Sequence, residues 1–107
     1  IDFSDGTHEG GWDSDPGMLT PGEPCHIAII VDGGPNIITF VVDGTVCDGG
    51  THRQFGWGRF APAIEDINGA ERASIFPSVN GTIESLRIYD RYLLNSEAIA
   101  NYYAGAK

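Results

Sequence analysis

The first half of the chain contains no lysine or arginine. Residues 1–50 carry nine aspartates and glutamates, whereas residues 51–107 carry six acids and six bases, so the first half accounts for the whole net charge of −9. An acidic surface repels phosphate backbones and anionic lipids. We therefore expect neither a nucleic-acid nor a membrane partner. The acids either attract cations or keep the protein in solution.

Long apolar runs are also missing, and cysteine is scarce. The apolar-rich stretches Ile27–Val31 and Ile37–Val42 have the length of strands and are too short to cross a bilayer. No leader peptide opens the sequence, so we expect a piece of a longer protein. The only two cysteines are Cys25 and Cys47. An even count in a glycine-rich chain favours a disulfide and an oxidising compartment, and two unpaired thiols are the alternative.

Fifteen glycines and six prolines in 107 residues, with 41% hydrophobic residues, predict one all-β domain with many turns. The strongest pattern is a hairpin, in which residues 26–32 run into the turn sequence of residues 33–36 and return as residues 37–44. Both strands are almost continuously apolar, so we expect central strands covered on both faces. Cys25 and Cys47 are then placed at the open end of the hairpin.

The rest of the chain predicts shorter elements. Residues 1–24 form a loop-rich lead-in in which only residues 1–4 look extended, and short strands are expected at 59–64 and 73–79. Asn80-Gly81 suits a turn. A strand with four apolar side chains should follow and contribute to the core, namely Ile83, Leu86, Ile88 and Tyr89. Asn95 is a good N-cap for a closing helix, with Glu97 in its first turn.

Three segments in this order resemble laminin-G-like and pentraxin-like domains. They are Pro24–Ala28, Phe40–Gly44 and the closing sequence G-x-I-x-x-L-R-I-Y-D-R-x-L at residues 81–93, although Cys25 and Val41 stand where the family usually has Trp and Tyr. The resemblance covers residues 22–103. It implies an antiparallel, concanavalin A-like jelly-roll β-sandwich with a short C-terminal helix and a core over residues 25–103. Because such domains are longer, we expect either the C-terminal portion of one, with the rest on a separate segment, or a cut-down domain whose exposed sheet edges need cover.

The same resemblance implies a secreted protein that binds glycans, in many relatives with calcium. Pentraxin-like domains place an acidic calcium loop before the closing strand, where this chain has Glu65 and Asp66 with Glu71 nearby. Carboxylates on loops are the ligands that calcium prefers. The alternative is a solvated loop in which Arg72 neutralises one acid.

Two tryptophans lie among glycines and polar residues. A flat aromatic ring on a loop can stack on a sugar, and Trp57 has Arg53, Gln54 and Arg59 close by in the sequence to bond hydroxyl groups. Trp12 is the second candidate. The alternative for both rings is that they cover one end of the core.

Enzyme signatures are poor. Adjacent acids such as Glu65 and Asp66 would point to opposite faces of a strand and could not flank one glycosidic bond. Asn80 opens the sequon N-x-T, which would be glycosylated in a eukaryotic secreted protein. The leading hypothesis is a lectin-like, carbohydrate-binding module of a larger secreted protein. The alternatives are the non-catalytic portion of a secreted glycoside hydrolase or a protein–protein adhesion module, completed by another segment or chain.

Overall fold

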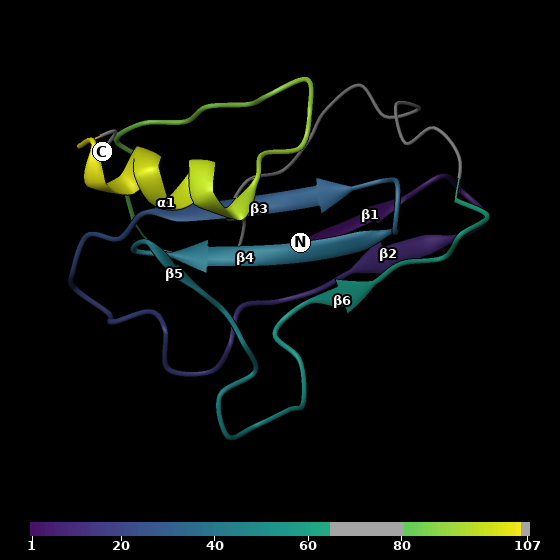
Figure 1. Ribbon diagram of the computed structural model, residues 1–107, viewed down its shortest axis with the longest axis horizontal. Helices are drawn as coiled ribbons and strands as arrows, with labels where there is room; N and C mark the ends of the chain where they lie inside the picture. The colour runs from purple at the N-terminus through teal and green to yellow at the C-terminus, as the bar shows by residue number, and fades with distance from the viewer. Residues whose placement is uncertain (65–80, 106–107) are drawn as a thin grey trace.

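The computed structural model describes residues 1–64 and 81–105, and all structural statements below refer to these residues. The elements in chain order are β1 (Asp2–Ser4), β2 (Glu9–Gly11), β3 (Ile27–Asp32), β4 (Ile37–Val42), β5 (Thr45–Val46), β6 (Gly58–Arg59) and α1 (Asn95–Tyr103). A four-stranded antiparallel sheet is formed by β3, β4, β5 and β6, and β1 pairs with β2 in a separate ribbon (Figure 1). The predicted β class and the terminal helix are therefore confirmed.

The hairpin of β3 and β4 is the longest paired unit. Its strands lie within the predicted ranges and are one residue shorter at the start of β3 and two at the end of β4, with Ile27 opposite Val42 and Asp32 opposite Ile37. Pro35, which has no N–H for a ladder, lies in the connection. Asn36 closes the connection with a φ of 59°, a left-handed conformation that asparagine tolerates better than most residues.

A second, tighter turn follows β4. Asp43 and Gly44 both have positive φ, at 49° and 76°, as a two-residue type I′ turn requires. The chain returns as β5 on the edge of β4 opposite β3. The Cys47 N–H donates to the Phe40 carbonyl and the Phe60 N–H to the Asn36 carbonyl. Even-numbered residues of β4 thus bond toward β5 and β6, and odd-numbered residues toward β3.

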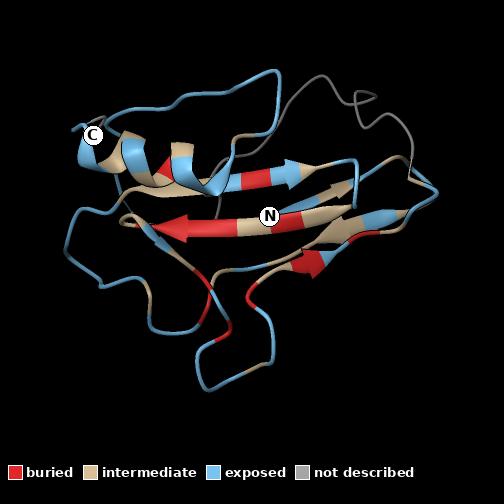
Figure 2. Cartoon of the chain, in the orientation of Figure 1, coloured by how far each residue is buried: buried red, intermediate tan, exposed pale blue. Residues whose placement is uncertain are grey.

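The sheet separates two apolar clusters, with β4 between them. One face carries a core of Ile38, Phe40, Val42, Cys47 and Phe60. The other face carries Ile30 and Val41, which pack against Ala98 of α1. Figure 1 shows α1 lying over β3 and β4, and Figure 2 shows how much of β4 is buried. The prediction of a strand covered on both faces is right for β4. It is wrong for β3, where Ile29 is 40% and Val31 38% exposed.

The lead-in is more ordered than its glycines predict. Phe3 of β1 makes an edge-on contact with the Phe60 ring, with centroids 5.2 Å apart. A side chain on Gly10 would collide with the Phe3 ring and the Phe60 Cβ, so glycine allows β2 to approach this closely. Trp12 and Met18 also pack against the first cluster. The ribbon and the loop after it thus cover one face of the sheet opposite α1.

The closing segment differs most from prediction. Residues 82–89 form no strand, and their four predicted core side chains are exposed, from 40% for Tyr89 to 85% for Ile88. Figure 2 shows the segment leading to α1 almost entirely as exposed. A jelly-roll sandwich is not confirmed by this arrangement. The predicted strand at 59–64 shortens to Gly58–Arg59, and the one at 73–79 lies outside the described residues.

The helix is as predicted, but its cap is not. Leu94 is the N-cap, with an extended backbone, and Asn95 is already the first helical residue. The leucine side chain has no acceptor for the N–H groups of the first turn, so the capping hydrogen bond comes from a side chain within the helix instead. The Glu97 carboxylate accepts the Leu94 N–H at 3.0 Å. Within the described residues, no helix is long and apolar enough to cross a membrane.

Candidate aromatic site

The loop between β5 and β6 is held to the lead-in by a buried carboxylate. Asp15 is only 6% exposed, and its Oδ2 accepts the Gly49 N–H at 2.8 Å. Gly49 has a φ of 98°, and a side chain there would collide with the Arg53 carbonyl. A buried carboxylate must be hydrogen-bonded to be tolerated. This contact therefore fixes the start of the loop.

Trp12 and Arg53 hold the other side of the same loop. The Trp12 Nε1–H donates to the Gly56 carbonyl at 2.9 Å, and the Arg53 guanidinium lies 4.1 Å from the centre of the Trp12 ring. Arg53 also donates to the Asp13 carboxylate and to the Asp13 carbonyl, each at 2.7 Å. Both residues were predicted as ligand contacts. In the structure, both side chains instead bond to the loop or to the lead-in and hold the loop in place. For Trp12 this agrees with the alternative that its ring covers the core.

Two aromatic rings project from the loop held in this way. Phe55 stacks on Trp57, with centroids 4.8 Å apart and planes inclined by 28°, and Phe55 is 49% exposed. Gly56 between them is buried, and a side chain there would collide with the Cys47 backbone. The glycine therefore lets the loop pack against the Cys47 backbone at the point between the two stacked rings. Sequence reasoning missed Phe55, whose signal was an aromatic residue two positions from Trp57 in a polar loop.

Charge and hydrogen-bonding groups adjoin these rings. The Arg59 guanidinium lies 5.7 Å from the centre of the Trp57 ring, and Arg59 is exposed. Among the described residues it makes no ion pair. Gln54, also exposed, precedes Phe55. The rings of Phe55 and Trp57 with Arg59 and Gln54 are called the aromatic site below. It offers a flat apolar face beside a cation and an amide.

The predicted calcium ligands cannot be placed. Glu65, Asp66 and Glu71 lie outside the described residues, as does the sequon residue Asn80. Across residues 1–64 and 81–105, no three His, Cys, Asp or Glu side chains gather as a metal site would require. Calcium therefore stays a prediction from sequence.

The two cysteines are free, and the predicted bridge is not formed. Cys25 is level with Gly44 in the hairpin register, whereas Cys47 pairs with Phe40 on the far edge of β4. Cys25 and Cys47 are therefore separated by four residues along the strand direction, which is about 13 Å, and by two strand spacings across the sheet, which is about 9.5 Å. A disulfide needs Cα atoms within about 7 Å. The Asp43-Gly44 turn brings Cys47 back along β4, away from the open end assumed from sequence.

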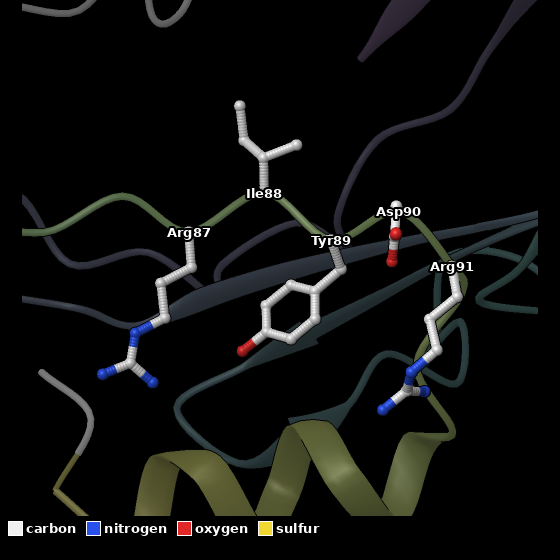
Figure 3. A pocket seen from close by; sticks show the side chains of 5 residues that line it. All are labelled: Arg87, Ile88, Tyr89, Asp90 and Arg91. Carbon is white, nitrogen blue, oxygen red and sulfur yellow. The ribbon is translucent and has the colours of Figure 1, made fainter.

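A second exposed surface lies beside α1. Arg87, Tyr89 and Arg91 extend toward the helix, while Ile88 points away (Figure 3). The Arg91 guanidinium makes two bonds to the Glu97 carboxylate, at 3.0 and 2.7 Å. The Tyr89 hydroxyl accepts a bond from the Asn101 side chain of α1 at 3.4 Å, so two polar groups of this surface are engaged with the helix. We assign the surface no ligand.

No protein-family model, curated protein or solved structure matches the chain. The candidate site therefore rests on its geometry and on the sequence resemblance described above.

Proposed function

We propose that this chain is a carbohydrate-binding module of a larger secreted protein, with the aromatic site as its sugar platform. The exposed Phe55 ring stacked on Trp57 is the observation that carries the proposal. A contiguous exposed apolar patch rimmed by polar residues is typical of a ligand-binding surface. Sugars present apolar C–H faces to such rings and hydroxyl groups to neighbouring polar side chains, here Gln54 and Arg59.

The rigidity of the loop supports this proposal. The contacts of Asp15, Trp12 and Arg53 hold the loop before any ligand arrives. A site that is already ordered loses less conformational entropy when it binds. The resemblance to laminin-G-like domains points the same way, and it extends the proposal to a jelly-roll fold completed by further sequence and to calcium as an assisting ion.

To test the proposal, a panel of oligosaccharides is titrated into the chain with and without calcium, and binding is measured by isothermal titration calorimetry. We expect at least one sugar to bind. Trp57→Ala and Phe55→Ala should each weaken it by about tenfold, which corresponds to about 1.4 kcal/mol. Tyr103→Ala is the matched control, because Tyr103 is 74% exposed but belongs to α1. Absence of sugar binding in both conditions, or equal affinity in all variants, would overturn the proposal.

A further inference from the structure

Among residues 1–64 and 81–105, nothing pairs with the outer edge of β3, the edge that faces away from β4. The Asp43 N–H donates to the His26 carbonyl at 2.8 Å, which sets the phase of the ladder. Even-numbered residues of β3 therefore bond toward β4, and Ile27, Ile29 and Val31 direct their N–H and C=O groups outward.

The same edge is apolar, and the strand itself carries none of the usual devices that protect an edge. Ile29 and Val31 expose 40% and 38% of their surface on one face of the strand. Natural sheets usually blunt such an edge with a lysine, a proline or a bulge. The six residues of β3 contain none of these and pair without interruption. The edge thus has the features of a strand-addition site.

The surrounding charge indicates what would bind there. Glu23 precedes β3, Asp32 ends it, and residues 1–50 contain no lysine or arginine. A second copy of the chain would bring the same acids and a further net charge of −9. Like charges oppose such pairing, whereas lysines or arginines at the ends of an incoming strand would face carboxylates.

We propose that the open edge of β3 binds an extended segment of a partner protein, in which apolar residues alternate along the strand and basic residues flank it. Added in antiparallel orientation, the segment would exchange backbone hydrogen bonds with Ile27, Ile29 and Val31. Its apolar side chains would extend the exposed face of Ile29 and Val31. This site is separate from the aromatic site.

The probe is a blocked nine-residue peptide of alternating valine and threonine with lysine at both ends, used below the concentration at which it self-associates. We expect saturable one-to-one binding by fluorescence anisotropy. The residues paired with Ile29 and its neighbours share their face and direct their N–H groups toward β3. N-methylation of the valines should therefore abolish binding, whereas N-methylation of the threonines should preserve it.

Two chain variants and a charge-reversed peptide complete the test. Ile29→Lys should weaken binding at least about tenfold, while Ile88→Lys, which adds the same charge at a side chain 85% exposed, should not. Circular dichroism checks that both variants fold. Glutamate in place of lysine in the peptide should also weaken binding. The proposal would be overturned if the peptide did not bind, or if its binding did not depend on its charge. It would also be overturned if the two methylations, or the two variants, had equal effects, or if a stable dimer of the chain blocked the edge.

Discussion

The Asp15 carboxylate accepts the Gly49 N–H at 2.8 Å and joins two segments that are 34 residues apart. We expect Asp15→Ala to lower the free energy of unfolding by about 1–3 kcal/mol, because it leaves a buried donor without a partner. Urea denaturation followed by tryptophan fluorescence measures the change.

Asp13→Ala is the control for this prediction. Its carboxylate is also paired with Arg53, but the side chain is 81% exposed, so its loss should cost about 1 kcal/mol or less. Equal losses in the two variants would mean that burial of Asp15 is not what stabilises the loop.

Gly58 has no room for a side chain, because a Cβ there would collide with the Trp12 ring. Gly58→Ala should therefore displace Trp12 and lower the free energy of unfolding by about 1–3 kcal/mol. Gly33→Ala is the matched control, because no atom lies within 4 Å of its added Cβ. Thermal melting of the two variants compares them, and an unchanged Gly58→Ala midpoint would contradict the packing.

The hairpin of β3 and β4 could be predicted from the sequence, because its apolar runs and its turn residues indicate the same structure. Apolar runs on both sides of a Gly-Gly-Pro-Asn connection define the hairpin, and Asp43-Gly44 has the composition of a type I′ turn. The pairing of β1 with β2 was not predictable in this way. β2 consists of Glu9, Gly10 and Gly11, and Gly10 packs closely against the side chain of Phe60, which is distant in the sequence.

The candidate site was also predictable only where neighbouring residues in the sequence determine it. Trp57 was identified from its polar, glycine-rich surroundings, but the roles of Trp12 and Arg53 depend on contacts between segments about 40 residues apart. Composition cannot reveal such contacts. Residues such as Ile83 and Ile88 have strand-forming side chains, and whether they pair depends on a partner strand.

The structure predicts different reactivities for the two thiols. Cys25 is exposed, whereas Cys47 is 2% exposed, and burial raises the pKa of both. Under native conditions a maleimide should label Cys25 slowly and leave Cys47 unmodified, as read by intact mass. Cys25→Ser should abolish native labelling and Cys47→Ser should not.

The same thiols give a second readout. Without a bridge, dithiothreitol should leave the unfolding midpoint unchanged. A lower midpoint in reductant, or a mass two hydrogens short of the reduced chain, would show that Cys25 and Cys47 are joined after all.

The first turn of α1 should respond to acid through Glu97. Its bonds to Arg91 and to the Leu94 N–H lower the pKa of Glu97 from 4.5 to about 2. Because the folded value lies below the unfolded one, the contribution to stability is complete above pH 4.5 and is lost as the pH falls through about 2. A carboxyl-detected NMR titration measures the value.

Arg91→Gln should return the pKa of Glu97 toward 4.5, since the bond to Arg91 is the largest cause of the shift. Arg87→Gln removes the same charge four residues earlier, where no bond to Glu97 is present among the described residues, and should leave the value near 2. Added salt should weaken the shift, because the pair is exposed. An unshifted Glu97 in the unmodified chain would contradict this geometry.

Two isoleucines distinguish the observed arrangement from the predicted one. Ile38 of β4 is fully buried in the cluster that contains Phe40 and Phe60, whereas Ile88, predicted as core, is 85% exposed. Ile38→Ala should lower the free energy of unfolding by about 2–5 kcal/mol through loss of packing. Ile88→Ala should change it by about 0.5 kcal/mol or less. Urea denaturation of both variants measures the two changes. A large loss of stability for Ile88→Ala would show that residues 82–89 pack in the core as a paired strand.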